Sequence, residues 1–244
     1  MQIKHLARMR SNDYSEVYQS QFNQEDSNLI VIHKRVVDPE EGIAYFNEKA
    51  ALEALNGNGF QRLLYSNDDT LELILSYIPG LPLEATKIDE EQKIPFILSL
   101  VDKLKNVHSA NFIHNDLKPS NVIVNVFGTG CLIDFGKACK TSAPQADYGT
   151  ELYAAPEAYM GSCSEKSDIF SLATITFELL TGMLPFGDLS GQSILNCYNN
   201  RLSCQLPQQY IPLAHLLTES LSPDADVRPD IDEFRYHLQR FYSK

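Results

Sequence analysis

Positive charge is scarce in this chain of 244 residues. Only 20 lysines and arginines stand against 32 aspartates and glutamates, and the formal net charge is −12. A nucleic-acid-binding surface needs clustered Lys and Arg side chains to contact phosphates, so this charge balance argues against that class of protein. It favours solubility and, to a small degree, basic partners.

Cysteine is also sparse, and none of the five cysteines forms a C-x-x-C pair with another. An odd number without paired spacing is typical of reduced thiols rather than of a disulfide framework or a zinc site. We therefore expect a cytoplasmic protein, although a compact chain of this kind is also compatible with delivery into another cell. Cys139 is the candidate for oxidation among the cysteines, because it lies close in the sequence to a candidate metal-binding aspartate.

Long apolar runs are missing as well. The most apolar block, residues 169–180, is interrupted by Ser, Thr and Glu. It is also shorter than the roughly 20 residues that a membrane span requires, so it predicts a buried helix. The amino terminus lacks the apolar core of a signal peptide, and we expect no membrane association.

The chain can bury a sizeable core, since 43% of its residues are hydrophobic and its length suits one large domain or two small lobes. Residues 15–22, 28–36 and 71–78 alternate or run apolar with β-branched side chains, which predicts strands. Residues 38–57 have apolar side chains at helical spacing and end in Asn-Gly, which predicts a helix.

After the breaker at residues 79–82 the pattern becomes mainly helical. Pro95 suits the first turn of one helix, and Gly182 and Pro185 should end the helix of residues 169–180. Smaller helices are expected near residues 191–199, 210–221 and 230–241. The prediction is an α+β fold in one domain, residues 1–244. Its small antiparallel β lobe with one main helix spans residues 1–78, and its larger helical lobe spans residues 79–244.

Residues 114–121, HNDLKPSN, crowd several reactive groups into one loop, including Asp116, Lys118 and Asn121. A second apolar strand, expected to end in Asp134, follows in CLIDFGKA at residues 131–138. Strand, loop, strand and loop should bring Asp116, Asn121 and Asp134 to one edge of a small ribbon. Carboxylate and amide oxygens are ligands that Mg²⁺ prefers, with substrate phosphates completing its coordination.

A metal, a positioned base and a cation are the parts that phosphoryl transfer requires. Asp116 could accept a proton from an attacking hydroxyl, while Lys118 neutralises charge on the transferred group. Lys34 is placed to hold the α- and β-phosphates from the β-rich lobe, and Glu48 on the following helix could orient it.

These motifs together resemble the eukaryotic-type protein kinase family, over nearly the whole chain. HNDLKPSN resembles the catalytic loop, DFG at residues 134–136 the magnesium-binding motif, and GTELYAAPE at residues 149–157 the end of an activation segment. The resemblance implies a Ser/Thr protein kinase that uses ATP and Mg²⁺ and acts on protein Ser/Thr hydroxyls. In it Asp116 is the base, Lys118 the γ-phosphate contact, and Asn121 and Asp134 the metal ligands.

The resemblance also implies a nucleotide site and an internal scaffold. Main-chain groups of the hinge would bind adenine, Lys34 and Glu48 would serve the phosphates, and apolar side chains would hold the nucleotide. The residues so implied are Ser76, Tyr77 and Ile78 in the hinge, and Val17 and Ile123 among the apolar contacts. Asp168 would hold the catalytic-loop backbone, Glu157 would pair with Arg228, and His114 would pack in the scaffold.

Two departures from the family pattern concern ATP. Arg10, Asn12 and Ser15 stand where glycines usually let the backbone approach phosphates. Ile32 replaces a small alanine that usually faces adenine. Asn tolerates left-handed backbone and Ser is small, so we expect ATP affinity to be reduced rather than lost.

The third departure concerns control. Asn115 replaces the arginine that often precedes the catalytic aspartate and grips a phosphate on the activation segment. The short segment here contains Thr141, Ser142 and Tyr148. We hypothesise that activity does not depend on phosphorylation of this segment.

Two other functions remain open from the sequence. A pseudokinase that acts as a binding or scaffold module would explain the missing glycines and Ile32, whereas the presence of Lys34, Asp116 and Asp134 favours catalysis. A small-molecule phosphotransferase is disfavoured by the APE element and the match of Glu157 with Arg228. The substrate protein and the oligomeric state are not indicated.

Overall fold

The computed structural model of the chain describes residues 2–11, 15–24, 27–38, 42–57, 59–144, 152–189, 193 and 205–243. It divides into two compact units: Met1–Pro79 with Ile133–Gly136, and Gly80–Leu132 with Lys137–Lys244. The predicted α+β architecture is confirmed, with an antiparallel sheet in one unit and most helices in the other. Sequence reasoning had placed residues 133–136 in the larger lobe, whereas they pack with the first unit.

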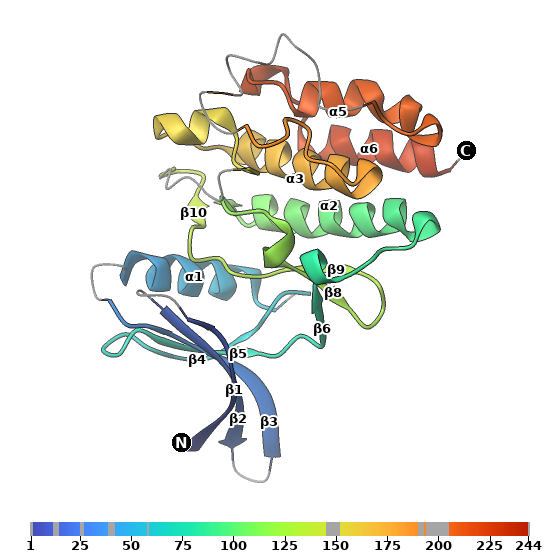
Figure 1. Cartoon of the computed structure of the whole chain (residues 1–244). Helices are drawn as coiled ribbons and strands as arrows, with labels where there is room; N and C mark the ends of the chain where they lie inside the picture. The colour runs from blue at the N-terminus through green and yellow to red at the C-terminus, as the bar shows by residue number, and fades with distance from the viewer. Residues whose placement is uncertain are drawn as a thin grey trace. The chain divides into compact units, whose positions relative to one another are not determined.

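The first unit is built on an antiparallel sheet with the strand order β1-β2-β3-β5-β4 (Figure 1). The strands are β1 (Gln2–Ser11), β2 (Ser15–Gln24), β3 (Ser27–Val36), β4 (Leu63–Asn67) and β5 (Glu72–Ser76). The three predicted strands are β2, β3 and β5. Val17 lies opposite Lys34 in the pairing of β2 with β3, so these side chains share a face, while Phe22, Val31 and Ile74 form a core cluster.

Helix α1 (Gly42–Leu55) packs against β3, β4 and β5 of this sheet. Its buried side includes Tyr45, Glu48 and Leu52, at the spacing of one helical face. The predicted Asn-Gly stop is confirmed, because Asn56 and Gly57 have φ values of 46° and 66° and cannot continue the helix.

Strand β1 was not predicted, and its pairing with β2 explains why. The register shifts once between His5 and Ala7 and again between Arg8 and Arg10. Each shift inserts an extra residue, a β-bulge, which breaks the alternation by which strands are recognised in a sequence.

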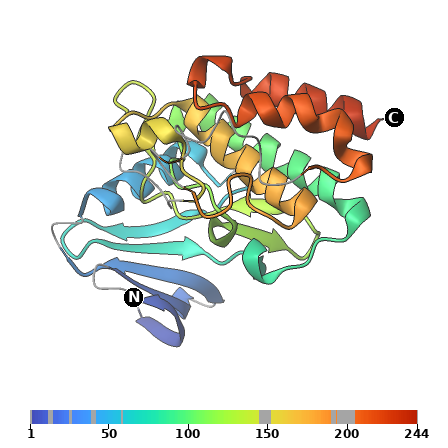
Figure 2. The same ribbon diagram turned by 45° about the horizontal axis from the view of Figure 1, so that its top comes forward.

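The second unit is mainly helical, and Figure 2 shows α3 beside α2, with α5 and α6 close to them. Its helices are α2 (Lys93–Ser109), α3 (Glu165–Thr181), α5 (Ala214–Ser220) and α6 (Ile231–Tyr242). The buried helix expected at residues 169–180 is confirmed as the core of α3, and Gly182 ends it with a φ of 76°. Among the residues described, no helix is long and apolar enough to cross a membrane.

The smaller predicted helices differ in outcome. Residues 230–241 correspond to α6, whereas residues 210–221 form a 3-10 turn, Gln208–Leu213, followed by α5. Pro212 lies in that turn, and a proline cannot donate the main-chain hydrogen bond of an α-helix. The helix expected at residues 191–199 falls outside the described residues, apart from Ser193.

Short strands position the loops of this unit. Strands β6 (Gly80–Pro82), β8 (Val122–Asn125) and β9 (Gly130–Leu132) form one sheet, and β7 (Phe112–Ile113) pairs with β10 (Cys139–Lys140). The strand predicted to end in Asp134 is shorter than expected. It ends at Leu132, and Asp134 has a φ of 63°, a left-handed conformation that a strand cannot contain.

Two exposed ion pairs join the surfaces of α2 and α6. Lys105 on α2 pairs with Asp232 on α6, and Arg235 Nε on α6 lies 2.6 Å from Asp102 Oδ1 on α2. Helix α2 therefore supplies the cation in the first pair and the anion in the second.

Candidate active site

The loop of residues 114–121 is fastened to the core of the second unit by Asp168 on α3. The Asp168 carboxylate accepts hydrogen bonds from the main-chain N–H groups of His114 and Asn115, at 2.8 and 2.9 Å, and lies 2.9 Å from His108 Nε2. Asp168 is only 1% exposed. The expected role of Asp168 in holding this backbone is confirmed.

Asn115 has a left-handed backbone, with a φ of 65°. Asn is one of the few residues that adopt this conformation readily. Its side-chain Nδ2 donates to the main-chain oxygen of Lys137 at 3.4 Å, so the loop is also tied to the segment that follows DFG. His114 is fully buried, as expected of a scaffold histidine.

Asp116, Lys118 and Asn121 come together around one carboxylate. Asn121 Nδ2 donates to Asp116 Oδ2 and to the Asp116 main-chain oxygen, both at 2.9 Å, and Lys118 Nζ lies 2.9 Å from Asp116 Oδ2. A 3-10 turn over Pro119–Asn121 creates this arrangement by bringing Asn121 back toward Asp116. Because Asn121 uses its nitrogen in both bonds, its amide oxygen keeps its acceptor capacity and fits a hard cation such as Mg²⁺.

Lys34 is the centre of the corresponding group in the first unit. Its Nζ lies 2.5 Å from Glu48 Oε2 and 2.7 Å from Asp134 Oδ1. Burial opposes a charge on Lys34, but the charges of Asp134 and Glu48 outweigh burial and raise the pKa of the ammonium. The predicted ion pair of Lys34 with Glu48 is present, and Lys34 stays protonated.

Contacts of the two residues that follow Asp134 hold this part of the backbone in place. Phe135 is 1% exposed and packs edge-on against Phe60, with ring centroids 5.9 Å apart. Asn47 Nδ2 on α1 donates to the main-chain oxygen of Gly136 at 3.3 Å. They hold the backbone beside Asp134, whose carboxylate oxygens are of the kind that Mg²⁺ prefers.

Arg10 is a site residue that sequence reasoning missed. Its Nη1 lies 3.4 Å from Asp134 Oδ2, the carboxylate oxygen that Lys34 does not contact. The only signal in the sequence is an arginine at a position where glycine is usual, and a sequence pattern does not show whether such a residue only removes a glycine or also adds a cation to the site.

The hinge residues are not equivalent. The main-chain N–H of Ser76 donates to Arg62 at 2.9 Å, and its main-chain oxygen accepts from Gln61 Nε2 at 3.2 Å. Among the described residues, the main-chain groups of Tyr77 and Ile78 form no hydrogen bond. Tyr77 and Ile78, unlike Ser76, therefore keep main-chain donors and acceptors that a ligand could use.

The residues predicted to make apolar contact with a nucleotide lie on β2, β3 and β8. Ile32 and Lys34 are two residues apart on β3, so they share the face to which Val17 also belongs. On β8, Ile123 is half-buried between Val122 and Val124, which point to the buried side. The predicted site residues thus form two groups, one in each unit.

A buried ion pair reinforces the second unit. Arg228 donates from Nη1 to Glu157 Oε1 at 2.7 Å and from Nη2 to Glu157 Oε2 at 2.8 Å. Ser167 adds a hydrogen bond to the same carboxylate at 2.8 Å. The predicted pairing of Glu157 with Arg228 is confirmed.

The family assignment follows from comparison with known proteins. The family model of the protein kinase domain matches residues 12–238. The chain belongs to the protein kinase family.

Several relatives of this kinase domain carry informative names. A probable serine/threonine-protein kinase of Dictyostelium discoideum is 30% identical over 184 residues, 71% of this chain and 22% of that protein. The mitosis inducer protein kinase cdr2 of Schizosaccharomyces pombe is 30% identical over 185 residues, 70% of this chain and 24% of that protein. Serine/threonine-protein kinase PrkC of Bacillus subtilis is 29% identical over 142 residues, 54% of this chain and 22% of that protein. The matched region thus spans about a quarter of each relative or less.

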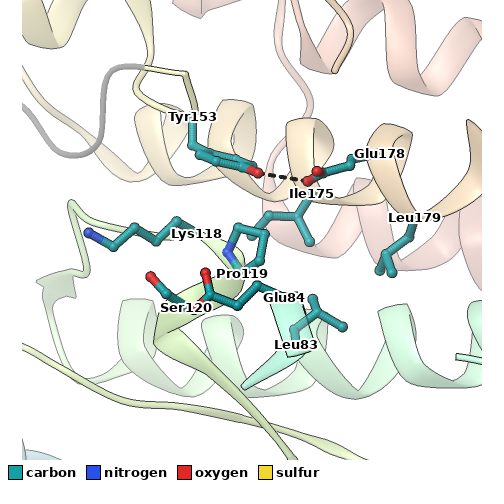
Figure 3. A pocket seen from close by; sticks show the side chains of 9 residues that line it. All are labelled: Leu83, Glu84, Lys118, Pro119, Ser120, Tyr153, Ile175, Glu178 and Leu179. Carbon is teal, nitrogen blue, oxygen red and sulfur yellow. Dashed lines mark hydrogen bonds between the residues drawn. The ribbon is translucent and has the colours of Figure 1, made fainter. Parts of the chain in front are cut away.

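A pocket of about 350 Å³ lies beside the catalytic loop of this kinase domain (Figure 3). Lys118 and Ser120 line it on the loop side, and Glu84 and Glu178 add two carboxylates. Tyr153 donates a hydrogen bond to Glu178 Oε2 at 2.8 Å. Burial and this hydrogen bond raise the pKa of Tyr153, so its hydroxyl remains a donor. Sequence reasoning had named only Lys118 among these residues.

Proposed function

We propose that the chain is a serine/threonine protein kinase, which transfers the γ-phosphoryl group of ATP to a Ser or Thr hydroxyl of a protein substrate. The observation that carries the proposal is the set of contacts around Asp116. Its carboxylate is oriented by Asn121 and Lys118, in a loop whose backbone is fixed by Asp168. A buried carboxylate held in this way suits a base that must meet a hydroxyl in one orientation.

The roles of the charged residues follow from their contacts. Asp116 would align the attacking hydroxyl and accept its proton, while Lys118 would stabilise the negative charge of the transferred phosphoryl group. Lys34 would hold the α- and β-phosphates. Glu48 keeps the ammonium of Lys34 charged and in place.

Asn121 and Asp134 are the residues that would hold Mg²⁺, through an amide oxygen and a carboxylate. When bound, the ion neutralises charge on the phosphates of ATP. Main-chain groups of Tyr77 and Ile78 would bind adenine, with Ser76 contributing less because its groups are already engaged. Val17 and Ile123 would supply apolar contact to the nucleotide.

A transfer assay tests the proposal. Labelled Mg-ATP is supplied with a generic basic protein, and incorporation is compared between wild type, Asp116→Ala and Lys34→Met. Both substitutions should lower incorporation by a factor of about 100 or more, because each removes a group that acts on the transition state. Asp102→Ala removes an exposed carboxylate on α2 and is the matched control, so its activity should equal that of wild type.

The alternative of a catalytically inactive pseudokinase is favoured by one observation. Arg10 and Ile32 replace small residues, and both lie on β strands of the first unit. A thermal shift with Mg-ATP, measured beside the transfer assay, separates the two functions. A shift without incorporation would favour the pseudokinase, and the absence of both would contradict any nucleotide-dependent function.

We also propose that activity is independent of activation-segment phosphorylation. Asn115 bonds to the Lys137 main chain without any phosphate, whereas an arginine at this position would need a charged partner. Thr141→Ala with Ser142→Ala should retain wild-type activity on an added substrate, and so should phosphatase-treated wild type. Loss of activity in either sample would show that phosphorylation is required. Tyr148 lies outside the described residues.

A further inference from the structure

A β-bulge redirects the side chain of Arg10. Arg8 lies opposite Tyr18 in the pairing of β1 with β2, and Arg10 lies opposite Val17, so two steps along β1 correspond to one step along β2. Residues two apart in a regular strand share a face. Tyr18 and Val17 are adjacent and face opposite sides, and Arg8 and Arg10 therefore face opposite sides too.

The bulge places Arg10 on the face of the sheet that carries Lys34. Val17 lies opposite Arg10 on one side and opposite Lys34 on the other, so the three residues form one row across β1, β2 and β3. Neighbouring strands are about 4.8 Å apart, which sets the backbones of Arg10 and Lys34 about 10 Å apart. Both side chains nevertheless reach the carboxylate of Asp134, Lys34 at Oδ1 and Arg10 at Oδ2.

The two cations are held to different degrees. Lys34 is 14% exposed and has a second carboxylate partner in Glu48, at 2.5 Å. Arg10 is 56% exposed and has a single contact to Asp134 at 3.4 Å. An exposed pair of this length contributes little stability, so the guanidinium can leave Asp134 for a stronger anionic partner.

The chemistry of Arg10 fits a phosphate. A guanidinium presents several N–H donors in a planar fork that matches phosphate oxygens, and it stays charged at any physiological pH. Glycine-rich loops bind phosphates through main-chain N–H groups that side chains would obstruct. An arginine in the row of Lys34 can instead supply its own donors.

We infer that Arg10 is a phosphate-binding residue for ATP and that it compensates for the glycines that the first hairpin lacks. The inference rests on the proposed function, because it names a further contact of the same nucleotide. Arg8 provides the contrast on the other face of the strand. Its Nη2 lies 2.8 Å from Glu16 Oε1, and its guanidinium lies 5.9 Å from the ring centre of Tyr18.

Calorimetric titration of ATP, ADP and adenosine in the presence of Mg²⁺ tests this role without relying on turnover. Arg10→Gln should weaken ATP binding about tenfold, should weaken ADP binding less, and should leave adenosine binding unchanged, since only the phosphates lose a partner. Arg10→Lys keeps a positive charge but lacks the planar fork of donors, so its affinity for ATP should lie between those of wild type and Arg10→Gln. Arg8→Gln, the matched control, should bind all three ligands as wild type does.

Three results for Arg10→Gln would overturn the inference. The variant could bind ATP as tightly as wild type does, it could bind ATP more tightly, or it could lose affinity for ATP and for adenosine by the same factor. Tighter binding would mean that Arg10 competes with the nucleotide for Asp134, and an equal loss would mean that the sheet is distorted. If wild type binds no ATP, the proposed function fails together with the inference. If wild type binds ATP and Arg10→Gln binds it equally well, only the inference fails.

Discussion

Arg228 is the largest of the side chains that are almost completely buried in the described part of the protein. Besides its two bonds to Glu157, it donates from Nε to the main-chain oxygen of Ser222 at 2.7 Å and from Nη1 to that of Lys166 at 3.0 Å. Its guanidinium also lies 5.0 Å from the ring centre of Phe170. A charge in the core is tolerated here because its donors are matched by acceptors.

Removal of this side chain should be costly at the scale of one residue. Arg228→Ala should lower the free energy of unfolding by about 3–5 kcal/mol, because it leaves the Glu157 carboxylate, only 14% exposed, without its partner. Arg235→Ala breaks an exposed pair with Asp102 and should cost less than about 1 kcal/mol. Urea unfolding of both variants measures the difference. Equal losses of unfolding free energy would contradict the view that Arg228 is stabilised in the core by its matched acceptors.

Two thiols form another close contact inside the second unit. Cys139 Sγ and Cys163 Sγ are 3.6 Å apart, and both side chains are buried. Burial, with the nearby Cys139, raises the pKa of the Cys163 thiol to about 12. Cys139 was expected to be the cysteine most open to oxidation, but its 6% exposure shields it.

These thiols should therefore be slow to react in the folded protein. At pH 8 we expect iodoacetamide to modify Cys139 and Cys163 at least about 100-fold more slowly than in urea, because both sulfurs are buried and the raised pKa makes the Cys163 thiolate rare. Peptide mapping by mass spectrometry follows each cysteine separately. Equal rates with and without urea would show that this region opens readily.

At the scale of elements, β9 lies unusually close to α2. A Cβ atom added to Gly130 would lie 2.2 Å from Leu100 Cδ2, and Leu100 is 1% exposed in the core. The main-chain N–H of Gly130 also donates to Ser99 Oγ at 2.9 Å, which fixes the strand in place.

Gly130→Ala should consequently destabilise the protein by about 1–3 kcal/mol, the usual cost of overpacking a core. Gly42→Ala is the matched control. Its added Cβ would meet the Leu71 side chain at 3.5 Å, an ordinary contact, and we expect its thermal midpoint to stay close to that of wild type. If the thermal midpoint of Gly42→Ala were lower than that of Gly130→Ala, the expected order of destabilisation would be wrong.

The elements that could be predicted from the sequence are those with an unbroken period. Strands β2, β3 and β5 and helices α1, α2, α3 and α6 repeat apolar residues at a strand or helix spacing, and Gly182 ends α3 as a glycine stop should. Strand β1 could not be predicted because its bulges interrupt the alternation. The left-handed Asp134 likewise gave no local signal that β9 ends at Leu132.

The site could be predicted as a set of residues but not as a set of contacts. The pair Lys34–Glu48 was predicted from the need for a cation on the β-rich lobe, and the pair Glu157–Arg228 followed from the family resemblance. The contact of Arg10 with Asp134 did not, because it depends on a register shift that no sequence pattern encodes. The assigned chemical roles of Asp116, Lys118 and Asn121 remain predictions.

At the scale of the whole molecule, acid should remove a defined part of the stability. Burial alone would raise the pKa of Glu157, but the hydrogen bonds and charge of Arg228 outweigh burial and hold this pKa below its ordinary value. The folded-state pKa is thus lower than the unfolded one, so the contribution is complete above about pH 4.5 and is lost as the pH falls further.

The difference in unfolding free energy between wild type and Glu157→Gln should therefore shrink as the pH falls from 6 to 3. Urea titrations at a series of pH values measure it. Glu219→Gln is the control, because the side chain of this glutamate is 41% exposed and should give a small difference at every pH. A difference between wild type and Glu157→Gln that grew on acidification would contradict the assigned sign.

The overall negative charge should also influence the choice of substrate. The net charge of −12 adds to the carboxylates of Glu84 and Glu178, which line the pocket beside Lys118. We expect kcat/KM to be several-fold higher for a peptide with Arg near the acceptor serine than for the same peptide with Gln, and this ratio should fall as salt rises from 50 to about 300 mM. Glu178→Gln should reduce the ratio, while a ratio unaffected by salt and by this substitution would exclude charge recognition.

The two ion pairs between α2 and α6 also determine how far one helix can slide along the other. Asp102 and Lys105 are three residues apart on α2, and Asp232 and Arg235 are three apart on α6, with the pairs crossed in polarity. A slip of three residues, about 4.5 Å, would set Lys105 against Arg235 in one direction and Asp102 against Asp232 in the other. Repulsion would oppose either displacement. These exposed charges therefore favour one alignment of α2 with α6, even though each pair adds little stability of its own.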